Sequence, residues 1–281
     1  MRKNEKTIFT PNELIEIAKN LRLDILKATT KAGSGHLSSS FSSVEILTAL
    51  FFNGILRYRP DEPHWPDRDR FIMSKGHAAP LLYAVLSKAG YFPREELWRL
   101  REVNSPVQGH PILGTMPGIE ATTGSLGQGI SLGIGHVLGA RLTDKKYRVY
   151  VLIGDGECQA GQIWESAMAA SQFHINELTV ILDYNKYQEM GPVSREMGLE
   201  PLIDKWRSFG WATAEVDGHD IQAVTEKIHT LQEIKDQPTI LIAHTIKGKG
   251  VTFVEQDYTW HGRAIKDPDQ YKMAEKELLC D

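Results

Sequence analysis

Two apolar segments stand out in the middle of the chain, at residues 149–153 (VYVLI) and 178–182 (LTVIL). Both are short, rich in β-branched residues and without polar alternation, which is typical of parallel strands buried on both faces. The segment between them, about residues 159–173, has helical composition and the length of a crossover connection. The pattern therefore predicts a βαβ unit at the centre of the protein.

Capping residues and hydrophobic periodicity predict further elements on both sides of this unit. Thr10, Pro11 and Glu13 are typical of a helix start with a capping box, and Ser42-Ser43-Val44-Glu45 predicts a second helix by the same capping logic. The remaining pattern predicts strands at 70–73, 212–216 and 239–246, and helices at 79–89, 94–102, 127–140 and 221–231, with 127–140 as a buried, glycine-packed helix. We therefore expect an α/β fold, an open and mostly parallel sheet with helices on both faces, in a single domain of residues 1–281.

Composition narrows the class of protein. The chain has 281 residues, enough for one large α/β domain, and a net charge of −4, which lacks the electrostatic footprint of a nucleic-acid-binding protein. Cys158 and Cys280 form neither a disulfide framework nor a zinc pattern. The polar N-terminus does not resemble a signal peptide, and the apolar run 126–140 is too short and glycine-rich for a membrane span. A cytoplasmic location is expected.

Polar residues follow both strands of the central unit. Asp155 and Asn185 lie thirty positions apart, directly after the two apolar segments. Ligands of open α/β sheets bind at the carboxyl ends of strands, and carboxylate and amide oxygens suit magnesium or calcium. Gly154 and Gly156 allow a backbone N–H to approach an anion. This indicates a metal-bridged diphosphate site, although a GDG turn and a solvated loop are the bland alternative.

Other loops carry candidate chemistry. Four histidines, at 36, 77, 110 and 261, lie in glycine-flanked loops, where a histidine is usually structural but is also well placed for proton transfer. Residues 122–129 are glycine-rich and precede a helix, which fits either an anion site or a packing turn, and they lack the Lys-Ser/Thr pair of an ATP-binding loop. Lys247 and Lys249 could bind phosphate or form a solvated basic loop, and the sequence does not distinguish the two lysines.

Several motifs together resemble the N-terminal, diphosphate-binding half of the transketolases, a family that depends on thiamine diphosphate. They appear in the family's order across nearly the whole chain: KAGSGH at 31–36, RFIMSKGHAAPLLYAVL at 70–86, QGHP at 108–111, TTGSLGQGIS at 122–131, GDGE at 154–157, DYNKYQ at 183–188 and WHG at 260–262. Full-length transketolases are more than twice as long, so the chain resembles the N-terminal subunit of a split transketolase with the family's diphosphate-binding type of domain.

The resemblance implies roles for individual residues. The metal, Mg²⁺ or Ca²⁺ in its place, would be bound by Asp155, Asn185 and the backbone carbonyl of Tyr187. Thiamine diphosphate would contact His77, Gly124, Leu126, Gly156 and His261. His36 and His261 would transfer protons at the sugar, and His110 would bind donor hydroxyls. Glu165 would belong to a carboxylate network between two cofactor sites, although Ala160 stands where the family usually has a glutamate of that network. Glu157 would be a partial substitute for that glutamate.

The implied activity is that of a transferase that moves a two-carbon ketol unit from a ketose, or its phosphate, to an aldose acceptor. The chain would supply the metal and diphosphate site, and a separate C-terminal subunit the pyrimidine-binding domain, in an α2β2 assembly active only when complete. The alternatives are a subunit of another thiamine diphosphate enzyme, similar to deoxyxylulose-phosphate synthase or a dehydrogenase, and a non-catalytic regulatory partner that binds diphosphate. The GSGH, GHP and WHG motifs favour transketolase over the other enzymes.

Overall fold

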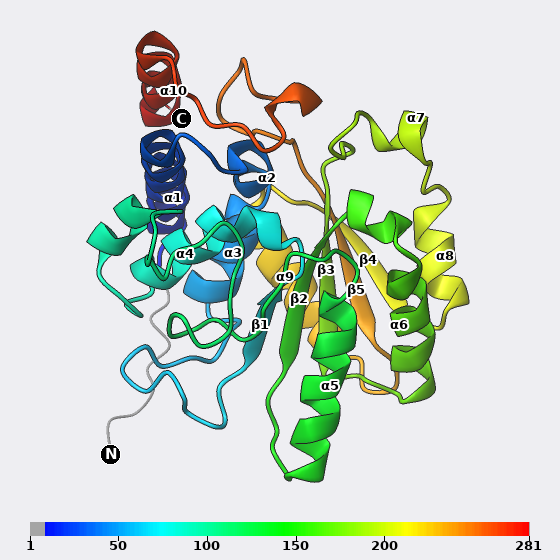
Figure 1. Ribbon diagram of the computed structural model, residues 1–281. Coiled ribbons are helices and arrows are strands. Elements are labelled where there is room, and N and C mark those ends of the chain that lie inside the picture. Colours follow the sequence, from blue (N-terminus) through cyan, green and yellow to red (C-terminus); the bar gives the residue numbers. More distant parts are fainter. Residues whose placement is uncertain (1–8, 281) are drawn as a thin grey trace.

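A five-stranded parallel sheet runs through the protein, which is described here by a computed structural model of residues 9–280 (Figure 1). Its strand order is β1-β2-β3-β5-β4. The strands are β1 (Arg70–Met73), β2 (Val149–Gly154), β3 (Leu178–Tyr184), β4 (Ala212–Asp217) and β5 (Thr239–His244). The two central apolar segments pair side by side in parallel, with Val149 opposite Leu178. The predicted βαβ unit and the predicted open parallel sheet are therefore confirmed.

Helices cover both faces of the sheet (Figure 1). One face packs against α5 (Gly129–Leu142), α6 (Gly161–Gln172) and α8 (Leu202–Ser208), and the other packs against α1 (Pro11–Ala32), α3 (Val44–Phe52), α4 (Ala79–Lys88) and α9 (Ile221–Gln232). Alternate residues of each strand enter the two cores. Val151 faces the first layer and Leu152 the second, for example, and both are fully buried. This double burial is the reason that the strands are almost continuously apolar.

The first long helix leads the chain into the region of the predicted site. The capping box of α1 is formed as predicted, because Thr10 N donates to Glu13 Oε2 (2.7 Å) and Glu13 N donates to Thr10 Oγ1 (3.4 Å). The helix ends at Gly33, whose φ of 60° is one that glycine adopts without steric cost. The chain then passes His36 and enters the short helix α2 (Leu37–Phe41).

The second helix begins near the predicted position, but its start is not stabilised by a cap. Neither Ser43 nor another side chain caps α3. Ser42 Oγ instead donates to Asp183 Oδ2 at 2.6 Å, and Glu45 forms an ion pair with Arg22 at 2.5 Å. The capping interpretation is therefore wrong in mechanism. These polar groups are buried, and buried tertiary partners take priority over the local backbone.

Other elements differ in type or were not predicted. The segment predicted as a helix at 94–102 is a 3₁₀ helix, η2 (Arg94–Arg99). Helix α5 is buried on one side only, since Leu132 and Leu142 on it are 37% and 88% exposed. The short or polar elements that hydrophobic periodicity missed are α2, α7 (Val193–Glu196), α8, α10 (Pro268–Cys280), and the 3₁₀ helices η1 (Gly76–Ala78), η3 (Gly156–Gln159) and η4 (Tyr258–Trp260). Between residues 9 and 280, each helix is too short or too polar to cross a membrane.

Two glycines of α5 give a matched test of its packing. A Cβ added at Gly133 would lie 2.9 Å from Val151 Cγ2 on the sheet, whereas a Cβ at Gly139 would meet nothing within 4 Å. We expect Gly139→Ala to stabilise the isolated chain by up to about 1 kcal/mol through helix propensity. Gly133→Ala should instead destabilise it by about 1–3 kcal/mol because the helix must move off β2. Chemical denaturation of both variants measures the difference, and equal stability changes would contradict this packing argument.

Candidate active site

A cavity of about 420 Å³ opens at the edge of the sheet where the parallel strands end. Segments that are far apart in the sequence meet there, because β1, β2, β3 and β5 all end at this edge. The lining residues come from loops and short helices along most of the chain: His36, Ser39, Lys75, His77, His110, Gly124, Leu126, Gly154, Asp155, Gly156, Glu157, Gln159, Asn185, Tyr187, Gln188, Glu189, Lys247 and His261. The cavity therefore gathers most of the residues singled out in the sequence.

The carboxylate of Asp155 lies directly after β2 and is 2% exposed. Its oxygens accept hydrogen bonds from the backbone N–H groups of Gly156 (2.7 Å) and Lys186 (2.5 Å), and within the described part of the chain no lysine or arginine forms an ion pair with it. Burial, together with the nearby charge of Asp183, raises the pKa of Asp155 to about 7. A buried carboxylate without a cationic partner is well suited to bind a metal cation.

The other two predicted metal ligands follow β3. Asn185 is 6% exposed, and its Nδ2 donates to Asp183 Oδ2 at 3.0 Å, which leaves Oδ1 as the atom available to a cation. Tyr187 lines the same cavity, and its N–H donates to Asn185 Oδ1 at 3.1 Å. Among residues 9–280, no group of three His, Cys, Asp or Glu side chains could hold a metal ion. One carboxylate, one amide and one backbone carbonyl fit a hard cation that also binds phosphate oxygens.

The four predicted histidines lie together in the cavity. The ring centroid of His36 is 5.0 Å from that of His77, 5.1 Å from that of His261 and 6.4 Å from that of His110. Burial lowers the pKa of all four, helped by nearby positive charges, to about 4 for His36 and about 3 for His261. The rings are therefore neutral near pH 7 and can accept a proton. His36 Nδ1 is buried without a hydrogen-bond partner, so it is available to a ligand.

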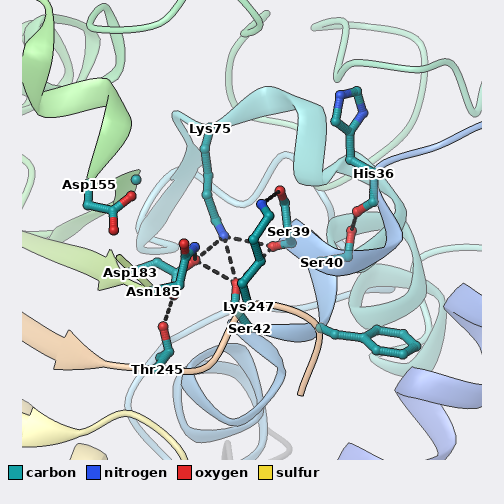
Figure 2. Close-up of polar contacts among 12 residues, drawn as sticks. His36, Ser39, Ser40, Ser42, Lys75, Asp155, Asp183, Asn185, Thr245 and Lys247 are labelled. Carbon is teal, nitrogen blue, oxygen red and sulfur yellow. Dashed lines mark hydrogen bonds and ion pairs between the residues drawn. The ribbon is translucent and has the colours of Figure 1, made fainter. Parts of the chain in front are cut away.

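Two buried lysines lie in the site, and both donate hydrogen bonds to Ser39 (Figure 2). Lys75 Nζ forms an ion pair with Asp183 at 2.5 Å and donates to the carbonyl of Ser39 at 2.8 Å. Lys247 Nζ lies 3.1 Å from both Ser39 Oγ and His261 Nδ1, and it has no carboxylate partner among residues 9–280. Burial and the charge of Lys75 lower the pKa of Lys247 to about 8. Lys247 is thus a buried, uncompensated cation facing a cavity.

The structure separates the two lysines that the sequence could not. Lys247 is 0% exposed and lines the cavity. Lys249 is not among the lining residues, and its ammonium lies 3.8 Å from Glu255 Oε1 on a side chain that is 36% exposed. The basic-loop interpretation therefore describes Lys249, and the anion-site interpretation describes Lys247.

The glycine-rich loop before α5 reaches the cavity through Gly124 and Leu126. Gly124 has a φ of 149°, and a Cβ there would lie 2.9 Å from His110 Cδ2. Leu126 is 41% exposed, so part of its surface is open to a ligand or to another chain. Gly156 is also required by space, because a Cβ at this position would lie 2.7 Å from Gln188 Cβ. These glycines let backbone and rings approach closely around the cavity.

Glu157 and Glu165 flank Ala160 in the sequence, but they differ in burial and in their contacts. Glu165 is exposed on α6 and does not line the cavity of this chain. Glu157 is buried, and its carboxylate accepts hydrogen bonds from Ser74 Oγ and from the backbone N–H groups of Gly127 (2.8 Å) and Gly154 (3.1 Å). These bonds hold Glu157 in place as a link between two loops of its own chain. Because its carboxylate already accepts these hydrogen bonds, little capacity remains for the role that the family resemblance gives to a glutamate at position 160.

Sequence reasoning missed several lining residues, among them Ser39, Lys75, Gln159, Gln188 and Glu189. A signal existed for Lys75, because a lysine directly after a short buried strand at a sheet's carboxyl end is well placed to meet a ligand. A signal also existed for Ser39, which belongs to a run of three serines that are all buried. The glutamines and the glutamate follow the GDGE and DYNKY motifs without a pattern of their own.

Comparisons with known proteins agree with this geometry. Residues 12–278 match the family described as transketolase, thiamine diphosphate binding domain. The chain is 38% identical over 257 residues to one of the subunits of the apulose-4-phosphate transketolase of Phocaeicola vulgatus, covering 92% of this chain and 90% of that protein. It is also 38% identical over 261 residues to the 6-deoxy-6-sulfo-D-fructose transketolase subunit SqwG of Clostridium sp., covering 93% and 94% of the two chains.

Longer transketolase chains match this protein over a smaller share of their own length. Human transketolase is 40% identical over 253 residues, which are 90% of this chain but 40% of that protein. The crystal structure of the transketolase from Campylobacter jejuni superposes with a TM-score of 0.90 at 27% identity, covering 96% of this chain and 43% of that one. The fold, the cavity and the family match lead to one conclusion: the chain belongs to the transketolase family, as its thiamine diphosphate-binding domain.

Proposed function

We propose that this chain is the metal- and diphosphate-binding subunit of a two-chain transketolase, and that residues 1–281 form one cofactor-binding domain. The complete enzyme transfers a two-carbon ketol unit from a ketose or ketose phosphate to an aldose or aldose phosphate. One observation carries the proposal. The same cavity contains Lys247, a buried lysine without a carboxylate partner among residues 9–280, and Asp155 and Asn185, whose oxygens can bind a hard cation. A metal diphosphate satisfies both requirements at once.

In this proposal Mg²⁺, or Ca²⁺ in its place, is held by Asp155, by Asn185 Oδ1 and by the carbonyl of Tyr187. Three protein ligands leave coordination positions for phosphate oxygens. Lys247 neutralises the diphosphate from the other side, with His77 and the N–H of Gly156 beside it. Thiamine diphosphate, when bound, supplies the carbanion chemistry that ketol transfer requires. The glycine-rich loop, through Gly124 and Leu126, borders the thiamine part of the cavity.

The histidines then handle protons of the sugar. His36 and His261 are adjacent and neutral, so each can take a proton from a substrate hydroxyl near pH 7 and return it to a carbonyl oxygen. The ring of His110 is less buried and hydrogen-bonds donor hydroxyls near the cavity mouth.

A second chain completes the enzyme in this proposal. The two relatives that this chain spans by 90% or more are named as subunits, whereas it spans 40% of human transketolase. A separate C-terminal subunit carries the pyrimidine-binding domain, in an α2β2 assembly within the cytoplasm. The exposed Leu126 and Glu165 would then meet other chains of the assembly. Sugars or sugar phosphates such as those in the names of the relatives are the substrate class.

The assembly gives the first test of function. We expect the purified chain alone to show no ketol transfer, and a mixture with the C-terminal transketolase subunit encoded beside it to be active. Activity is measured by a coupled assay with thiamine diphosphate, Mg²⁺ and a panel of ketose phosphates. Asp155→Ala in the mixture is the control that should abolish turnover by removing the charged metal ligand. Ketol transfer by the single chain, or by the Asp155→Ala mixture, would refute the proposal.

The two neighbouring lysines provide a matched test of the diphosphate site. Lys247→Met should weaken thiamine diphosphate binding by about 10–100-fold, since a hydrogen bond to a charged group is worth about 1.5–3 kcal/mol. Lys249→Met removes the same charge from the same loop outside the cavity and should leave affinity nearly unchanged. Isothermal titration calorimetry measures both. Equal effects of the two substitutions would mean that only the general charge of the loop matters.

The pH dependence of this binding follows from the lowered pKa of Lys247. The empty site loses the lysine proton as the pH rises through about 8, and only the charged form attracts the diphosphate. The affinity of the wild-type chain should therefore fall as pH rises above 8, by about tenfold per pH unit well above that value. Lys247→Met should lack this decline. An identical pH profile in the two proteins would contradict the assignment.

Histidine substitutions separate proton transfer from binding. In the assembled enzyme, His36→Ala and His261→Ala should lower kcat by about 10²–10⁴-fold at saturating cofactor. His77→Ala should mainly weaken cofactor affinity. His244→Ala is the control, because His244 pairs with Glu215 outside the cavity. Steady-state kinetics and thermal melts of the same variants decide the matter, and full kcat at both 36 and 261 would end the proton-transfer role.

A further inference from the structure

One fully buried carboxylate lies behind the metal ligands without lining the cavity. Asp183, near the end of β3, is 0% exposed, and four side chains donate to it (Figure 2). Its Oδ2 accepts from Lys75 Nζ (2.5 Å), Ser42 Oγ (2.6 Å) and Asn185 Nδ2 (3.0 Å), and its Oδ1 accepts from Thr245 Oγ1. The proposed chemistry gives no role to Asp183.

The four donors come from four segments that each present a residue to the cavity. Ser42 ends the α2 segment that contains Ser39, and Thr245 lies two residues before Lys247. Lys75 and Asn185 line the cavity themselves. The side chain of Lys75 passes the end of β2, where a Cβ added at Gly154 would lie 3.8 Å from Lys75 Cδ, to reach β3. A single carboxylate thus ties together the loops after β1, β3 and β5 and the turn before α3.

The bond from Asn185 has a direction that matters for metal binding. An ionised carboxylate only accepts hydrogen bonds, so the NH₂ group of Asn185 must face Asp183. The amide oxygen is then forced to the opposite side, toward the cavity. The N–H of Tyr187, which donates to Asn185 Oδ1 at 3.1 Å, favours the same orientation, so without Asp183 only this one bond would oppose the turned amide, whose NH₂ cannot bind a cation. The charge of Asp183 therefore selects the orientation in which Asn185 is a ligand.

The ion pair with Lys75 keeps Asp183 ionised. Lys75 Nζ lies 2.5 Å from Asp183 Oδ2, and the hydroxyls of Ser42 and Thr245 donate to the same carboxylate. The two side chains of this ion pair are only 2% and 0% exposed. Burying such a pair costs desolvation energy that a well-packed apolar pair would avoid. Stability of the fold is therefore a poor explanation for this buried ion pair.

We propose that Asp183, kept charged by Lys75, is the positioning residue of the metal site and holds the amide oxygen of Asn185 toward the cation. This inference rests on the proposed metal diphosphate site and goes beyond it. Asp183 touches neither metal nor cofactor in this role. Its contribution is to fix one of the two amide orientations before the ligand arrives, which lowers the cost of binding.

The test measures metal binding directly in the full chain. Mn²⁺ replaces Mg²⁺, and the electron paramagnetic resonance signal of free Mn²⁺ is titrated at saturating thiamine diphosphate. Asp183→Asn can accept or donate at position 183, so Asn185 is no longer held in one orientation. We expect Mn²⁺ affinity to fall by about 10–100-fold, the usual effect of losing a partner that orients a metal ligand. Asp155→Ala sets the level expected for a site that has lost a ligand.

The double variant Lys75→Met/Asp183→Asn is included because Asp183→Asn alone leaves a buried ammonium without its partner and can destabilise the fold. It leaves no unpaired buried ammonium and keeps the net charge of the site. Lys75→Met alone, compared with it, shows how much of any loss comes from removing a cation that lines the cavity. Glu45→Gln is the matched control. Glu45 is likewise buried and ion-paired, with Arg22 at 2.5 Å, but it lies outside the cavity. This control should lower thermal stability and leave the Mn²⁺ affinity of the folded protein unchanged.

The outcomes are distinct. A wild-type chain that binds no Mn²⁺ with thiamine diphosphate contradicts the proposed function itself. Wild-type binding that is weakened at least tenfold in the double variant, with Glu45→Gln unaffected, supports the role of Asp183. Wild-type affinity in the double variant overturns that role, whatever the single variant does. Equal losses in the double variant and in Glu45→Gln overturn it too, because they would reflect general destabilisation.

Discussion

The burial of the parallel sheet on both faces is the constraint on which the rest of the structure depends. Because helices cover each face, strands β1, β2, β3 and β5 are largely apolar and polar groups are concentrated where they end, whereas the edge strand β4 is more polar and more exposed. Parallel strands all end on the same side, so the loops after β1, β2, β3 and β5 converge there. The cavity and its ionisable groups follow from this topology.

The buried charged groups at this edge of the sheet lower the stability of the fold and favour the binding of a charged ligand. Lys75 and Asp183 neutralise each other, but Asp155 and Lys247 remain without partners of opposite charge in contact among the described residues. Burial shifts the pKa of both toward the neutral form, to about 7 for Asp155 and about 8 for Lys247. A metal diphosphate would reverse both shifts, since it brings positive charge to the carboxylate and negative charge to the lysine. The cost of folding around these groups is thus recovered when the ligand binds.

Ala160 lies beside the glycine-rich loop that borders the cavity. Its Cβ lies against the glycine-rich loop, where a Cβ added at Gly127 would be 3.0 Å away. Glu157, three residues earlier, fastens the same loop to the end of β2 through the N–H groups of Gly127 and Gly154. The loop is therefore anchored from within the chain.

The sequence by itself determined the fold class, the central βαβ unit and the position of most of the cavity. Each of these follows from local information: apolar segments of strand length, a crossover of helical length, and polar residues directly after strands. The pair Asp155 and Asn185 could be named because each follows a buried strand and strand ends converge, whereas the four histidines were named from their glycine-flanked loops and from the family resemblance. The capping box of α1 could be predicted for the same reason, since its partners are three residues apart.

Only the tertiary structure decided which polar groups act together. Ser42 was predicted as part of a helix cap but binds Asp183, 141 residues away, because both are buried and each needs a partner. Lys247 and Lys249 have the same local sequence context, and burial alone distinguishes them. The link from Asp183 to Lys75 spans 108 residues. Hydrogen bonds and ion pairs between buried groups depend on distances across the packed core, and a linear pattern of residues does not contain those distances.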